Sequence, residues 1–96
     1  MHSAGLVLVE NLDGDADGEA GSWKNFVGGK CAFVSESSSW SSGSCKLQLK
    51  ARNGGIVDVA THSANAITAL ELPPGEYRAF VTDAQDVYSG IYRIPY

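Results

Sequence analysis

The clearest pattern along the chain is a strict alternation of apolar and polar residues in the segment 45–52. The apolar positions are Cys45, Leu47, Leu49 and Ala51, and every position between them is polar. Successive side chains of a β-strand point to opposite faces of the sheet, so this period of two predicts a strand with one face buried. We expect these four side chains to point into a core and the polar set to face outward.

Other short apolar segments are separated by residues that favour turns. Asn53-Gly54-Gly55 supplies the positive φ angles of a hairpin, and the Pro-Pro-Gly of 73–75 is a rigid turn that leads into another alternating run. No segment sustains a helical period, and 62–69 is interpreted as a loop leading into a strand. Strands are predicted at 31–35, 45–51, 56–60, 66–72, 76–82 and 87–94.

These elements predict an all-β protein. The spacing of short strands and turns is typical of a compact antiparallel β-sandwich or small barrel of about six to eight strands. We assign 23–96 to a single β domain and 1–22 to an N-terminal arm with an acidic, glycine-spaced loop. The arm contains the apolar run 6–9, which lies either on a neighbouring subunit or back on its own sheet.

The chain length and charge limit the classes of function. With 96 residues there is room for one small core, so oligomerisation or docking on a larger body would add useful stability. A net charge of −4 argues against a nucleic-acid-binding surface. Lys46, Lys50 and Arg52 form either a positive stripe for a protein partner or a solvated strand face.

Neither a membrane span nor an export signal is expected. No apolar run approaches the length that crosses a bilayer, and the run 5–9 is too short for the core of a signal peptide. The product is therefore expected in the cytoplasm or in a particle assembled there.

The acidic loop begins like an EF-hand. Asp13, Asp15 and Asp17 alternate before Gly18, but Lys24 occupies the twelfth position, where an EF-hand has its bidentate glutamate. An EF-hand is therefore disfavoured. A weak calcium site completed by backbone carbonyls and a flexible acidic linker remain as alternatives.

The two cysteines allow two interpretations. Cys31 and Cys45 share the parity of the core residues Phe33 and Leu47, so a disulfide between paired strands is geometrically allowed. Reduced, buried thiols are the favoured interpretation, because cytosolic assembly keeps thiols reduced. A zinc site is disfavoured, since no Cys-x-x-Cys motif is present.

Catalytic patterns are not visible. The serines lack a G-x-S-x-G elbow, and His2 and His62 lie in a tail and a loop. The expectation is a protein without enzymatic activity and without a cofactor. Trp40, within the serine-rich segment 35–44, either binds a partner or a sugar ring or folds down onto its own core.

An ordered set of residues resembles a known group of proteins. Trp23, Gly28-Gly29, Phe33, Leu47-Gln48-Leu49 and the stretch 72–79 (LPPGEYRA) look like small virion structural proteins of tailed bacteriophages, similar to capsid decoration (cement) proteins. The resemblance covers 23–94. It implies a β domain that binds the outside of an assembled capsid and clamps adjacent subunits of the major capsid protein.

The resemblance also implies how such a protein would assemble. A homo-oligomer is expected, and trimers around local threefold positions are common in the family; the protein would be located in the virion. The arm and the aromatic loops would make the contacts. The interface candidates are Leu6, Val7, Leu8, Val9, Trp23, Trp40 and Tyr96.

Two other functions remain as alternatives. One is a carbohydrate- or receptor-binding module of a phage tail or cell surface, which would use Trp40, Tyr88 and Tyr92 as stacking platforms. Tyr88 and Tyr92 share parity on the last predicted strand, which fits a stacking face and a core face equally well. The other is a secreted sandwich stabilised by a disulfide between Cys31 and Cys45 and by calcium.

Overall fold

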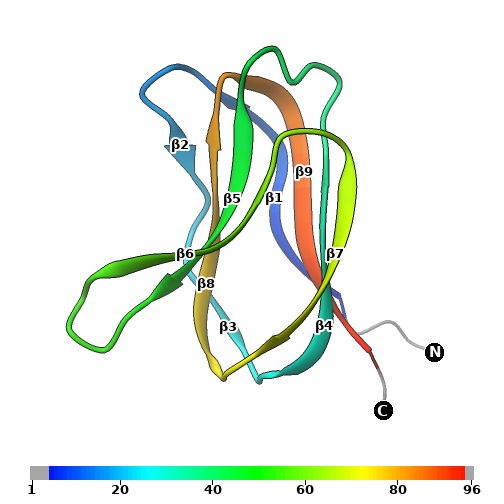
Figure 1. Cartoon of the computed structure of the whole chain (residues 1–96). Helices are drawn as coiled ribbons and strands as arrows, with labels where there is room; N and C mark the ends of the chain where they lie inside the picture. Colours follow the sequence, from blue (N-terminus) through cyan, green and yellow to red (C-terminus); the bar gives the residue numbers. More distant parts are fainter. Residues whose placement is uncertain (1–4, 95–96) are drawn as a thin grey trace.

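Each strand predicted from the alternation is present in the structure. The structure is a computed structural model and describes residues 5–94. Figure 1 shows the strands, which are β1 (Gly5–Gly14), β2 (Glu19–Ala20), β3 (Lys24–Phe26), β4 (Gly29–Glu36), β5 (Ser44–Lys50), β6 (Ile56–His62), β7 (Ala66–Leu72), β8 (Gly75–Thr82) and β9 (Ala84–Arg93). Residues 5–94 contain no helix that is long and apolar enough to cross a membrane.

The strands form two antiparallel sheets. The four-stranded sheet has the order β1-β9-β4-β7, and the five-stranded sheet has the order β2-β8-β5-β6 with β3 also paired to β8. The inward faces of the two sheets bury one continuous apolar cluster between them. The predicted all-β antiparallel sandwich is therefore confirmed, with β1 and the two very short strands β2 and β3 added to the six predicted strands.

The alternation of β4, β5 and β8 builds the centre of the core. The fully buried side chains include Phe33, Leu47, Tyr77 and Val81. The expected inward face of β5 is confirmed for Cys45 and Leu47, whereas Leu49 is only half-buried.

The Pro-Pro-Gly turn is fixed by the tyrosine that follows it. The hydroxyl of Tyr77 donates a hydrogen bond of 2.6 Å to the carbonyl oxygen of Pro73, four residues upstream. The Tyr77 ring is fully buried and meets Phe26 edge to face, with 6.0 Å between the ring centroids. This arrangement resembles the tyrosine corner of β-sandwiches, in which a buried ring ties a turn to the core. It explains why the segment needs a tyrosine after the turn.

The N-terminal apolar run lies on its own sheet. β1 pairs antiparallel with β9 from Gly5 to Gly14, and Leu8 and Val9 are 3% and 6% exposed in the same core as β4 and β8. Of the two alternatives for the arm, the structure has the one in which the arm lies back on its own sheet, so residues 5–14 pair with the domain at 23–96. Because Leu8 and Val9 are buried, they are not available as an interface; Val7, 38% exposed, is the outward residue of this run.

The two cysteines are free, buried thiols on different sheets. Cys31 lies on β4 and Cys45 on β5, so the direct strand pairing that a cross-strand disulfide requires is absent. Burial raises the pKa of both thiols. The structure thus has two reduced, buried thiols, which is the interpretation that the sequence favoured over a disulfide.

Thiol labelling is expected to separate the native and unfolded states. The native protein should react slowly with an aromatic disulfide reagent, because both sulfur atoms are buried and their raised pKa values leave little thiolate. In denaturant, two thiols per chain should react at once. Immediate reaction of either thiol in the native protein would contradict this packing.

Candidate functional site

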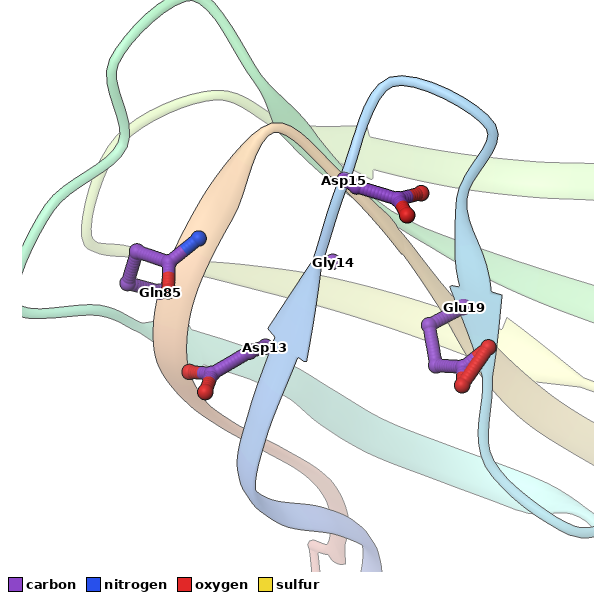
Figure 2. A pocket seen from close by; sticks show the side chains of 5 residues that line it. All are labelled: Asp13, Gly14, Asp15, Glu19 and Gln85. Atoms are coloured by element: carbon purple, nitrogen blue, oxygen red, sulfur yellow. The ribbon is translucent and has the colours of Figure 1, made fainter.

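Acidic side chains surround a hollow at one end of the sandwich. Figure 2 shows Asp13, Asp15 and Glu19 around this hollow, which is also lined by Gly14 and Gln85. In this view the carboxylates of Asp13 and Asp15 point to opposite sides of the chain. The acidic side chains therefore do not converge on one point.

Two of these carboxylates have structural partners. Asp15 Oδ1 accepts hydrogen bonds from the backbone N–H groups of Asp17 (3.0 Å) and Gly18 (3.1 Å), which closes the turn after β1. Asp13 Oδ1 accepts one from the N–H of Asp86 at 2.8 Å. Within residues 5–94, no group of three or more His, Cys, Asp or Glu side chains is placed to hold a metal ion. The weak calcium site suggested for Asp13, Asp15 and Asp17 thus lacks the convergence of carboxylates that it needs.

A cationic and aromatic cluster lies on the five-stranded sheet. The Arg78 guanidinium carbon lies 4.6 Å from the centre of the Trp23 ring and 5.8 Å from that of Phe80. Lys50 Nζ lies 5.9 Å from the Trp23 ring. Such contacts hold a cation against the electron-rich faces of the rings. We call Trp23, Lys50, Arg78 and Phe80 the cationic face.

Hydrogen bonds fix the position of Arg78 within this face. Its Nε donates to Gln48 Oε1 at 2.8 Å, and Gln48 Nε2 donates to Asp58 Oδ1 at 2.9 Å. Lys46 forms a 3.6 Å ion pair with Asp58. The stripe expected from Lys46, Lys50 and Arg52 is therefore divided: Lys46 is paired, and Arg52 lies in the turn beyond β5.

Trp40 packs on its own domain. Its indole lies half-buried against the core, and its Nε1 donates a 2.7 Å hydrogen bond to Asn65 Oδ1. Asn65 Oδ1 also accepts the N–H of Ser37 at 2.9 Å. Of the two alternatives for Trp40, the structure has the one in which the ring caps the core.

A polar network lies inside the sandwich. His62 Nδ1 is 2.8 Å from Ser35 Oγ, and its Nε2 is 2.7 Å from Thr68 Oγ1. Ser35 Oγ is 3.3 Å from Ser89 Oγ, and the His62 ring stacks on Phe33 at 4.5 Å. The Ser–His contact has the length found in nucleophilic dyads, but Ser35 is 1% exposed. The network satisfies buried polar atoms rather than presenting a nucleophile to a substrate.

Burial of His62 predicts that stability falls in acid. Desolvation lowers the pKa of His62 below its ordinary value of 6.5, so the unfolded chain binds a proton more readily than the native protein does. The free energy of unfolding should therefore be at its full value above about pH 6.5 and decrease as the pH falls below it. Urea unfolding between about pH 7.5 and 5 checks this. The loss should be smaller in His62→Gln, which does not titrate; an equal loss in both proteins would contradict the assignment.

The C-terminal tyrosines lie on the outside of the four-stranded sheet. Val87, Ser89 and Ile91 of β9 are fully buried, so Tyr88 and Tyr92, of opposite parity, face outward. Their hydroxyls hydrogen-bond to each other, and this contact raises the pKa of Tyr88 to about 12. Tyr88 also lines a shallow hollow with Asn11, Glu36, Ser37, Ser38 and Asp86. Their shared parity allowed either a core face or a stacking face, and in the structure both tyrosines lie on the outward face of the sheet.

The remaining interface candidates are dispersed. Leu6 is partly buried against the core, Trp23 belongs to the cationic face, and Tyr96 lies outside the described residues. Among residues 5–94, the most exposed large apolar side chains are Val27 (68%), Ile56 (50%), Val57 (48%) and Ile67 (71%), and none of them was among the predicted interface residues. Alternation assigns only one face of a strand to the core and gives no signal for apolar residues at a sheet edge.

Comparisons with known proteins found no relative. No protein-family model matches the chain, and neither the curated proteins nor the solved structures include a significant match.

Proposed function

We propose that the protein is a non-enzymatic virion structural protein that binds the outside of an assembled tailed-phage capsid and stabilises contacts between coat subunits. The proposal is supported by the resemblance of 23–94 to capsid decoration proteins. It is also supported by the buried position of the Ser35 and His62 pair, which leaves that pair without access to a substrate.

The hairpin of β5 and β6 is the observation that carries this proposal. Figure 1 shows it extending sideways, away from the four-stranded sheet. Lys50 pairs with Ile56 and Leu49 with Val57, and the turn is closed by the Ala51 N–H bonded to the Gly55 carbonyl at 2.8 Å. Ile56 and Val57 are each about half exposed although their side chains are large and apolar. Successive side chains of a strand point to opposite faces, so the hairpin presents one exposed apolar side chain on each face, and we take these two side chains as its contacts with coat subunits.

A protein bound in this way stabilises the capsid by mass action. If the hairpin contacts two coat subunits, binding is strong only when both are in place, so the assembled lattice is favoured over separated subunits. The two hydrogen-bonded sheets act as a rigid body, which lowers the entropy lost on binding. No reaction and no cofactor are part of this proposal.

Quantitative mass spectrometry of purified virions tests the location. We expect copy numbers close to those of the major capsid protein. A handful of copies per particle would move the protein to the tail or a vertex, and absence from the virion would overturn the proposal.

Co-sedimentation with assembled capsids tests whether the protein binds the capsid through the hairpin of β5 and β6. The double variant Ile56→Asp/Val57→Asp should lose binding, because charge replaces the apolar contact. Ile67→Asp is the matched control, since Ile67 is also exposed but lies on β7 at the edge of the other sheet. Equal binding by both variants would exclude the hairpin as the contact.

A second candidate function rests on the outward tyrosines. Tyr88 and Tyr92 give an aromatic surface beside a hollow with Asn11, Glu36 and Asp86, which are side chains suited to sugar hydroxyls. Calorimetric titration with oligosaccharides tests it: binding that is lost in Tyr88→Ala would support a carbohydrate-binding module. Binding unchanged in Tyr88→Ala, or no binding at all, would exclude this surface.

A further inference from the structure

We propose that β7 binds an extended segment of another protein, which joins the four-stranded sheet as a fifth strand. The segment carries apolar residues at alternate positions and a lysine or arginine beside Glu36. This contact lies beyond the proposed capsid function and does not depend on it. Figure 1 shows β7 at the right of the molecule and the hairpin of β5 and β6 at the left, so a copy bound through the hairpin still presents β7.

The outer edge of β7 has unpaired backbone groups. Within residues 5–94, β4 is the only strand that pairs with β7, and no backbone hydrogen bond from a turn or loop reaches it. Ile67, Ala69 and Glu71 are exposed, so no other element of residues 5–94 covers the outward face of the strand. A row of free N–H and C=O groups along an extended strand is a template for another extended chain. The chemistry of this edge therefore specifies a polypeptide backbone as its partner.

The other edge strands carry features that hinder such pairing. β1 has three register shifts opposite β9, and β6 has one opposite β5. β2 and β3 contain only two and three residues. By contrast, β7 pairs with β4 through seven residue pairs without a shift, and it contains neither proline nor lysine. Bulges, short strands and lysines protect natural sheet edges, so β7 is the edge within residues 5–94 that is left open to another chain.

The alternation of β7 sets the pattern of the segment. Thr68 and Leu70 face the inside of the sandwich: Thr68 Oγ1 lies 2.7 Å from His62 Nε2, and Leu70 packs against the core. Residues of an added strand that lie opposite these inward positions extend the buried layer, so apolar side chains are favoured there. Residues opposite Ile67 and Ala69 lie on the outward face.

A hollow beside the start of β7 specifies one side chain of the segment. Val34 and Ile67 are neighbours on adjacent strands and form its apolar part. Glu36 lacks a cationic partner in residues 5–94, where the one ion pair joins Lys46 and Asp58. A lysine or arginine fits this combination, because its stem packs on apolar surface while its charge reaches the carboxylate. The residues that line the hollow are Val34, Ser35, Glu36, Asn65, Ala66 and Ile67.

Amide hydrogen exchange of the full chain, with and without a capped peptide of sequence VTVTVKV, tests the proposal. Aligned antiparallel to β7, the peptide places its lysine opposite Ile67 and its valines opposite the inward residues. We expect saturable binding and slower exchange of amides in β7, because edge amides become hydrogen-bonded. The same peptide with every backbone nitrogen methylated keeps its side chains but loses its donors, so it should not bind.

Three protein variants test the position of the contact. Ile67→Lys should weaken peptide binding about tenfold or more, because it places a like charge opposite the peptide lysine. Val7→Lys is the matched control and should bind like the wild type: Val7 is also exposed and lies in the same row of the sheet, at the opposite edge. Glu36→Gln should weaken binding about threefold, and should not change binding of a peptide with glutamine in place of the lysine.

Four outcomes would overturn the inference. They are absence of peptide binding, equal binding of the methylated peptide, slower exchange in a strand other than β7, and slower exchange in β7 that follows protein concentration without peptide, which would assign the edge to a second copy. A protein that binds capsids but not the peptide would keep the capsid function and lose this inference alone. Peptide binding without capsid binding would do the reverse.

Discussion

Replacing Gly43 by alanine is expected to lower the free energy of unfolding by more than about 3 kcal/mol, a large share of the total for a domain of this size. A Cβ atom at this position would overlap the carbonyl oxygens of Thr82 and Asp83. Both are backbone atoms, so relief requires the chain itself to move. That movement would disturb the pairing of Ser44 with Thr82 and the bond from the Gly43 N–H to the Trp40 carbonyl at 2.6 Å.

Gly55→Ala is the matched control for this substitution. Its Cβ would have no neighbour within 4 Å, so the change should alter stability by no more than about 0.5 kcal/mol. Urea unfolding of the wild type and both variants gives the comparison. Similar midpoints for Gly43→Ala and Gly55→Ala would show that the loop after β4 does not pack against β8 as described.

Local sequence patterns predicted the long strands most directly where one face is buried, as in β5 and β8. The predicted bounds of 66–72 agree with β7, and 76–82 differs from β8 by one residue. β2 and β3 have two and three residues, too few for an alternation to be recognised. β1 was only partly predicted, because register shifts after Val7, Val9 and Leu12 break its period of two.

The candidate surfaces were harder to predict because each joins residues distant in sequence. The cationic face combines Trp23, Lys50 and Arg78 from three separate segments, and only strand pairing brings them together. The acidic hollow combines residues of 13–19 with Gln85, and the bond from the Asp83 N–H to the Asp15 carbonyl brings these distant segments together. From its position on the polar face of its strand, Lys46 was expected to be free to contact a partner protein. In the structure it forms an ion pair with Asp58 on the next strand.

Truncating Phe33 to alanine is expected to destabilise the protein by about 3–5 kcal/mol. Its ring is fully buried at the centre of β4, which is paired on both sides by β7 and β9, so the surrounding backbone has little freedom to collapse into the cavity. The stacked contact with His62 at 4.5 Å is lost as well.

Urea unfolding at about pH 7 measures the cost of removing Phe33, and Val27→Ala is the matched control because Val27 is 68% exposed. The control should stay within about 0.5 kcal/mol of the wild type. The Phe33 cavity should also admit water to His62, which reduces the desolvation that lowers its pKa. The Phe33→Ala variant should therefore lose less stability than the wild type as the pH falls below about 6.5. A full acid-induced loss in that variant would show that Phe33 does not shield the imidazole.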